Sequence, residues 1–184
     1  QDVLRPLPFD AAKLDGLSER LIRSHWENNY GGSVKALANV KTRLAQATGD
    51  KDLPPYIYND LKREHLVRTG SVVLHELYFE NLGGSGQPGG DERAAIATAF
   101  GSFDAWETEF RRIGAGLGGG SGWVVLGFNV HTRQLENYWL AGHSHWPAAT
   151  LPLLVLDLYG PSCHTAPAPA PATLTPPPCN TLLG

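Results

Sequence analysis

The chain has 184 residues, with 42% hydrophobic and 18% charged residues and a formal net charge of −3. These values are typical of a soluble globular protein with one domain or two small lobes. A slightly acidic chain with a pI near 6.2 gives no electrostatic basis for binding nucleic acid or an anionic membrane surface. No apolar segment reaches the ~20 residues that a membrane span needs. The chain shows no signal-peptide pattern, and both a cytoplasmic and an exported (periplasmic) location are compatible with it.

The first half of the chain has the pattern of two long helices. Asp10 is a candidate N-cap, and apolar residues then recur at helical spacing as far as Leu44. Gly31-Gly32 is expected to weaken this helix unless close packing needs small residues there, and Pro54-Pro55 marks its break from the next one. A second helix is predicted over residues 58–81, with inward-facing Leu61, Leu66, Val73 and Leu77. The two helices together predict an antiparallel helical hairpin.

The second half mixes helices and strands. Asp91 and Ser102 are candidate N-caps of two shorter helices, which are expected to end near Arg112 and Leu117. A glycine-rich loop at 114–122 is interpreted as a turn into a strand, because no Gly-Lys-Ser/Thr sequence follows it as in a phosphate-binding loop. Three strands are predicted over 123–130, 134–141 and 151–156, with a hairpin turn at 131–133. The expected fold class is α+β, with a three-stranded antiparallel sheet.

Composition divides the chain into three parts. The segment 83–90 is rich in glycine and is the expected boundary between an N-terminal α-hairpin domain (1–88) and a C-terminal α+β domain (89–160). The remainder, 161–184, is rich in proline and alanine and has no Asp, Glu, Lys or Arg. Because proline disrupts helices, this tail is expected to be disordered. Both cysteines, Cys163 and Cys179, lie in it, and its loose context gives little reason for them to pair.

A candidate metal site can be drawn from three residues that are far apart in the sequence. His25 and His75 lie on predicted helices, and Asp157 follows a predicted strand. Imidazole and carboxylate ligands suit first-row metals such as iron and manganese. The set also fits the two-His-one-carboxylate site of non-haem iron oxygenases, although no cosubstrate motif accompanies it. Taken alone, a buried histidine is more often a hydrogen-bonded core residue than a ligand.

Several segments carry a family resemblance, and they occur in the family's order across residues 6–160. These segments are Leu7–Asp10, Arg23–His25 with Val34–Leu37, His75–Leu82, Phe100–Asp104, Gly120–Phe128 and Leu151–Asp157. With them the chain resembles the iron/manganese superoxide dismutases, whose Leu-Pro-Tyr-Asp opening and His-x-x-Phe-Trp-x-Asn-Leu motif have close counterparts in the first and third of these segments.

The resemblance implies a function and a set of site residues. His25, His75 and Asp157 are expected to bind one Mn or Fe ion, which would disproportionate superoxide to dioxygen and hydrogen peroxide. His143 is expected to take the place of the residue that hydrogen-bonds the bound solvent, with His145 at the surface as the other possibility. Trp123 is expected to form part of an apolar wall. The family's gateway tyrosine falls at Ser33, and Tyr30 is the candidate to supply a hydroxyl instead.

The resemblance ends after Tyr159. Pro161 occupies the position of the family's fourth ligand, a histidine, and Gly160 replaces a glutamate that bridges to the partner subunit. We therefore expect impaired metal retention and a weakened form of the homodimer or tetramer that the family builds. The alternative is a non-catalytic remnant or binding protein with the same fold. The residues do not choose between Mn and Fe, because that preference depends on the surroundings of the ligands.

Overall fold

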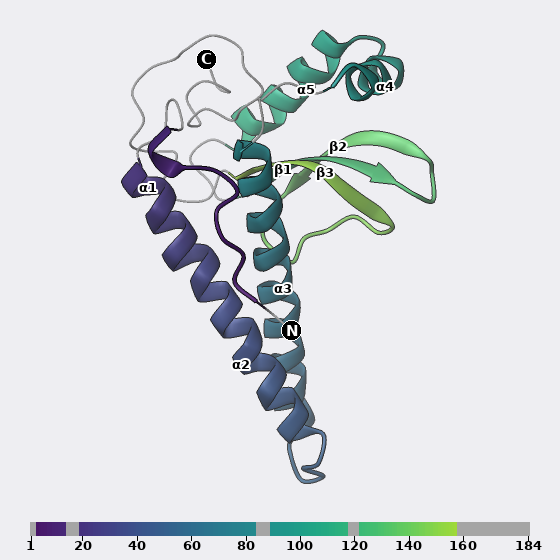
Figure 1. Ribbon diagram of the computed structural model, residues 1–184. Helices are drawn as coiled ribbons and strands as arrows, with labels where there is room; N and C mark the ends of the chain where they lie inside the picture. Colours follow the sequence, from purple (N-terminus) through teal and green to yellow (C-terminus); the bar gives the residue numbers. More distant parts are fainter. Residues whose placement is uncertain (1–2, 14–18, 84–88, 118–121, 158–184) are drawn as a thin grey trace.

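The computed structural model describes residues 3–13, 19–83, 89–117 and 122–157. In Figure 1, two long helices form a hairpin, and a three-stranded sheet lies beside the upper part of that hairpin, with two shorter helices above the sheet. This arrangement confirms the α+β fold class. The tail with Pro161, Cys163 and Cys179, and the central part of the glycine-rich connector, lie outside the described residues.

The first predicted helix is built from several shorter elements. A 3₁₀ turn covers Ala11–Lys13, and Asp10 caps it by accepting the Ala12 amide at 3.0 Å. Helix α1 (Glu19–Ser24) then runs into a π-helical turn, η2 (His25–Tyr30), and α2 (Gly31–Ala47) continues from it. The helix changes type just before Gly31-Gly32, and α2 starts at Gly31, so these glycines lie at the junction of two helical elements; their weakening effect stays a prediction.

Helix α3 (Pro55–Gly83) is longer than predicted, and a different face of it is buried. Leu66 and Val73 were expected to face inward, yet they are 56% and 43% exposed. Leu77, by contrast, is partly buried and packs against the core as expected. The sequence places apolar residues on more than one side of α3, so periodicity alone selected the buried stripe only in part. The buried face instead carries the ligand candidate His75 together with Ser71, Leu74, Tyr78, Phe79 and Leu82.

Two shorter helices precede the sheet, α4 (Gly90–Phe100) and α5 (Phe103–Gly116). Ser102 is confirmed as the N-cap of α5, since its hydroxyl accepts the Ala105 amide at 3.0 Å. Asp91 is not a cap, because α4 begins one residue earlier with Gly89 in the cap position. Asp91 lies in the first turn instead, where the negative charge of a carboxylate interacts favourably with the helix dipole. Helix α4 ends at Phe100, well before the predicted Arg112, whereas α5 ends at Gly116, next to the predicted Leu117. Residues 118–121 of the glycine-rich segment lie outside the described residues.

The sheet is antiparallel, with strand order β2-β1-β3. Its strands are β1 (Trp123–Asn129), β2 (Gln134–Leu140) and β3 (Thr150–Asp157), close to the predicted bounds. The predicted turn at 131–133 is present, and Arg133 adopts a φ of 57° in it. Central strand β1 is buried on both faces over its first five residues. Trp123 opens this strand directly opposite Asp157, the last residue of β3.

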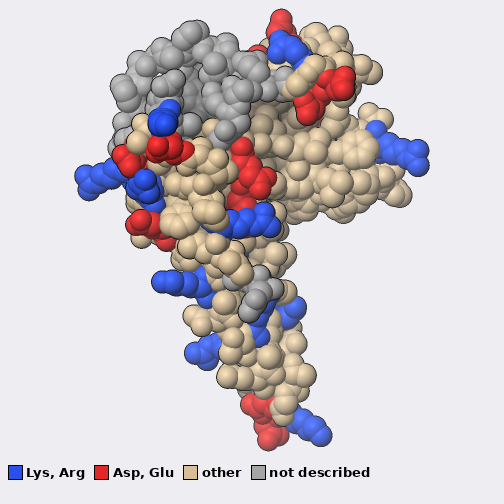
Figure 2. All heavy atoms as spheres, in the orientation of Figure 1, with Lys and Arg blue, Asp and Glu red and all other residues tan. Residues whose placement is uncertain are grey.

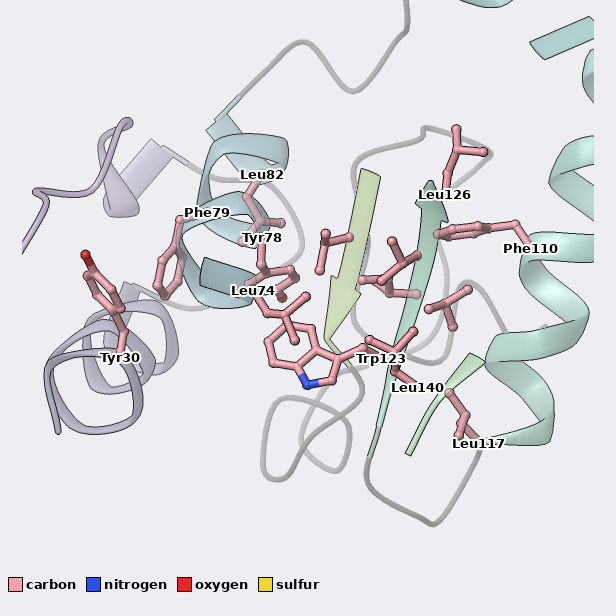
Figure 3. Packing of buried hydrophobic residues seen from close by; sticks show 14 of the residues in the cluster. Tyr30, Leu74, Tyr78, Phe79, Leu82, Phe110, Leu117, Trp123, Leu126 and Leu140 are labelled. Atoms are coloured by element: carbon pink, nitrogen blue, oxygen red, sulfur yellow. The ribbon is translucent and has the colours of Figure 1, made fainter. Parts of the chain in front are cut away.

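Helices α3 and α5 lie on either side of the sheet, and the core joins all three layers (Figure 3). Trp123 of β1 points from the sheet toward Tyr78 of α3. Phe110 of α5 and Leu117 pack on the opposite side of the sheet. None of the described helices combines the length and the apolar character that a membrane crossing requires. Lys and Arg side chains are interspersed with Asp and Glu on the face shown in Figure 2 rather than gathered into one patch.

Candidate metal centre

Three buried side chains from three elements converge at one point. His25 opens η2, His75 lies in α3, and Asp157 ends β3. Each offers one ligand atom, and these atoms all lie within 4.8 Å of one another. Asp157 Oδ2 is 2.8 Å from His25 Nε2 and 3.8 Å from His75 Nε2. The three side chains are at most 8% exposed, so water reaches this cluster poorly.

The π-helical turn explains how His25 and Tyr30 both become buried. In an α-helix, a separation of five residues rotates the second side chain by roughly 140° from the first. A π-turn closes i→i+5 hydrogen bonds, and such turns are frequently found at functional sites. Here it leaves both His25 and Tyr30 on the inner side, at 8% and 1% exposure. Both rings then pack on Phe79, with ring centroids 5.5 and 5.9 Å away.

The second histidine is held by its own helix. His75 Nδ1 lies 2.6 Å from the Ser71 carbonyl oxygen, which can only accept a hydrogen bond, so Nδ1 carries the proton and donates. That bond leaves the Nε2 lone pair directed at the cluster. Burial, only partly offset by the attraction of Asp157, lowers the pKa of His75 to about 4, so the ring is neutral at pH 7. The Ser71 hydroxyl also bonds Ser33 of α2 at 2.7 Å, which ties the two hairpin helices together beside the ligand.

The carboxylate is positioned by a bond between α3 and the sheet. Asn81 Oδ1 accepts the backbone amide of Val155 at 2.8 Å. Val155 lies two residues before Asp157, so both side chains point to the same face of the strand. The contact therefore fixes the end of β3 against the helix that carries His75. Asn81 belongs to a segment that the family resemblance selected, but its role follows only from the geometry.

A third histidine approaches the cluster from the connection between β2 and β3. His143 has its ring centroid 5.8 Å from that of His75, and its Nδ1 accepts the Trp123 indole N–H at 3.0 Å. An accepting Nδ1 leaves the proton of the neutral ring on Nε2. Burial lowers the pKa of His143, which favours this neutral form. His145 lies apart, with its Nδ1 bonded to the Ala141 amide and its ring against exposed Trp139.

Tyr30 is held by a network that connects the N-terminal segment to α3. Its hydroxyl accepts the Arg5 amide and donates to Glu76 Oε2, both at 3.0 Å. The backbone carbonyl of Arg5 accepts the Trp26 indole N–H at 2.9 Å, and the Arg5 guanidinium lies 3.3 Å from Glu76. The pKa of Tyr30 is raised, mainly by burial, so the hydroxyl keeps its proton. Sequence reasoning gave no sign of Arg5 or Glu76, since a lone charged residue carries no pattern.

This network leads to a prediction about stability. Tyr30→Phe removes one hydroxyl and leaves the Arg5 amide and the Glu76 carboxylate without that partner. We expect the free energy of unfolding to fall by about 1–3 kcal/mol, since the remaining polar groups stay partly buried. Urea denaturation monitored by circular dichroism measures this change. Tyr138→Phe is the control, because its hydroxyl makes a 3.4 Å contact with Glu136 on the surface and its loss should change stability by less than ~0.5 kcal/mol. Equal losses in both variants would contradict the assigned network.

The donor set fits iron or manganese. Two imidazoles and a carboxylate match the ligand preferences of these metals, and all three converge from buried positions. His25 Nε2 is buried and lies 2.8 Å from the other ligand atom Asp157 Oδ2, yet no hydrogen bond of suitable geometry is formed by this nitrogen within the described part of the chain, as expected for a lone pair that serves a metal. Over that same part, no further His, Cys, Asp or Glu joins the cluster. Pro161, at the predicted position of a fourth ligand, lies outside it.

Comparison with known proteins points to one family. Residues 88–163 match the family described as iron/manganese superoxide dismutases, C-terminal domain. The chain is 46% identical over 164 residues to an iron superoxide dismutase of Cupriavidus metallidurans, a match that covers 88% of this chain and 81% of that protein. It is 32% identical over 153 residues to an iron superoxide dismutase of Aquifex aeolicus, covering 79% and 70%. With a manganese superoxide dismutase of Mycobacterium intracellulare it shares 29% over 160 residues, covering 85% and 76%.

Proposed function

The chain belongs to the iron/manganese superoxide dismutase family, and we propose that its residues His25, His75 and Asp157 hold the single Fe or Mn ion with which it disproportionates superoxide. The observation that carries this proposal is the convergence of these three ligand atoms within 4.8 Å of one another in a buried position. The similar proteins carry names for both metals, so iron and manganese are both cofactors of the family.

The chain's own groups set the charge of the site. Bound iron or manganese supplies the one-electron acceptor and donor that the two halves of the reaction require. His25 and His75 contribute neutral nitrogen ligands, and the Ser71 carbonyl keeps the His75 proton on the far nitrogen. Asp157 contributes the negative charge. Because it lies in a buried site of low dielectric, this charge offsets a cation more strongly than it would in water.

His143 has the geometry of a hydrogen-bond donor to a small oxygen species at the centre. With Nδ1 accepting from Trp123, the neutral His143 ring carries its proton on Nε2, and we assign this N–H to substrate or solvent beside the ligands. The overall reaction converts two superoxide ions and two protons into one dioxygen and one hydrogen peroxide. His143 therefore serves to orient the group that receives the protons, with Trp123 holding its ring.

Aromatic rings form the wall of this site. Trp123 is fully buried and meets the His75 ring edge-on, with centroids 5.1 Å apart. Tyr78 and Phe79 each have their centroid 5.5 Å from that of His25. Burial raises the pKa of Tyr78, so this residue remains uncharged. Rings at these positions exclude bulk water and strengthen every electrostatic interaction inside. We assign Tyr30, whose hydroxyl is bonded to Glu76, to the outer part of the same wall.

Among the described residues the protein ligand set stops at three, and this predicts weak metal retention. Pro161 has no ligating side chain at the position of the family's fourth ligand, and Gly160 lacks the carboxylate that bridges to a partner subunit. We propose that the chain loses metal more readily than a four-ligand relative and that its homodimer or tetramer is weakened.

We also propose that residues 1–88 and 89–160 form its two domains.

The test is metal content together with activity. The full chain is purified from cells supplied with both Mn and Fe, metal per chain is measured by mass spectrometry, and superoxide removal is measured per bound metal. We expect binding of Mn or Fe that declines on dialysis against a chelator, with dismutation in proportion to the metal retained. Superoxide removal that is independent of bound metal, or metal-loaded protein without activity, would contradict the proposal.

A further inference from the structure

Gly70 occupies a position in α3 where no side chain fits. A Cβ atom built on Gly70 would lie 1.7 Å from the carbonyl oxygen of His143 and 2.8 Å from its carbonyl carbon. Contacts of Cβ below 3.0 Å essentially do not occur in proteins. The obstacle is backbone, not the flexible end of a side chain, so no rotamer change could relieve it. The main chain of His143 therefore packs directly on the helix at this glycine.

A glycine in the interior of a helix lowers its stability relative to alanine. Such a position usually has a packing reason, and close approach of another backbone is one of them. The helical glycines of this chain differ in this respect. Gly32 in α2 and Gly116 in α5 have nothing within 4 Å of a built Cβ, whereas Gly70 has the His143 backbone against it. The contact is therefore specific to the segment that carries His143.

The consequence concerns the depth to which His143 reaches into the site. Gly70 lies five residues before the ligand His75 on the same helix. Trp123 bonds the His143 ring from the sheet side, so the histidine is held between α3 and β1. Any side chain at Gly70 must push the His143 backbone away from α3, while the His75 ligand on that helix stays in place.

We propose that Gly70 is a positioning residue, which sets the distance between His143 and the metal ligands by allowing its backbone to rest on α3. This inference rests on the function proposed above, in which His143 donates a hydrogen bond at the centre. A displacement of about 1 Å in a reacting group can reduce a rate by about 100-fold. Gly70 therefore affects the rate without touching substrate or metal.

The test compares Gly70→Ala with Gly32→Ala in the full chain. Both changes add one methyl group to a glycine inside a helix of the same hairpin, but only the first meets the His143 backbone. The first readout is the Trp123 indole N–H resonance of the ¹⁵N-tryptophan-labelled, metal-free chain, assigned with Trp123→Phe. The second is the rate of superoxide removal per bound metal. We expect Gly70→Ala to move the Trp123 resonance toward its position in His143→Ala and to lower the rate at least ~10-fold. Gly32→Ala should change neither.

The two readouts separate this inference from the proposed function. An unchanged Trp123 resonance in Gly70→Ala would overturn the role of Gly70 and leave the metal site unaffected. A shifted resonance with a normal rate would overturn the proposed role of His143. If Gly70→Ala folds poorly, a glycine inserted after Ser144 gives the connection room to retreat. That double variant should regain its fold while its rate stays low, and recovery of the full rate would count against the inference.

Discussion

Asp157→Asn should abolish metal retention while leaving the fold intact. The asparagine side chain has nearly the same size, so the packing at the end of β3 is preserved, but the negative charge at the cluster is lost. Loss of an outer partner of a metal ligand already costs about 10–100-fold in affinity. Loss of the carboxylate ligand itself should lower affinity for Fe or Mn by more than ~100-fold. Superoxide removal should fall to background, and metal per chain after dialysis measures the first effect.

Stability should respond in the opposite direction. Asp157 is 2% exposed, and holding a carboxylate in a buried position carries a desolvation cost. In the metal-free protein, Asp157→Asn should therefore not lower the free energy of unfolding. Asp104→Asn, at an exposed position in the first turn of α5, is the matched control, for which metal content should be unchanged. If Asp157→Asn retained metal, Asp157 would not be a ligand, and if its metal-free form unfolded, the loss of metal would be only a secondary effect.

The sequence alone contained most of the layers of this fold. Ser102 was predicted as an N-cap from its hydroxyl and is one. The three strands lie close to their predicted bounds. The same reasoning selected the wrong face of α3, where Leu66 and Val73 proved exposed. Apolar residues occur on more than one side of that helix, so the stripe is decided by what packs on it. Periodicity cannot supply that information.

The grouping of the metal ligands came from resemblance rather than from physical reasoning. His25, His75 and Asp157 are separated by 50 and 82 residues, and nothing in their local patterns indicates that they meet. The π-turn at His25–Tyr30 was equally hidden, because it resembles an ordinary helix in composition. Gly70 was the one missed feature with a visible signal. A glycine inside a strong helical pattern is one place where another backbone can approach closely, but the approaching partner lies 73 residues away in the chain.

Trp123→Phe should lower the rate of superoxide removal per bound metal by about 10- to 100-fold, the range typical for partners that orient a group at a metal site. Phenylalanine keeps an aromatic ring in the wall but lacks the indole N–H that His143 Nδ1 accepts. Without that donor, the neutral His143 ring can carry its proton on either nitrogen, and Nε2 is no longer held as a donor toward the centre. Metal content should change little, because no ligand is altered.

Trp106→Phe is a close control for this change. Trp106 is also fully buried, and its indole N–H donates to Asn137 Oδ1 at 2.9 Å. Both variants remove one buried hydrogen bond and part of a ring, so both should lose stability by a few kcal/mol, of the size seen for large core truncations. Only Trp123→Phe should slow the reaction, since only its hydrogen bond reaches the metal site. Equal rates per bound metal in the two variants would make Trp123 a packing residue and remove the link between the sheet and the orientation of His143.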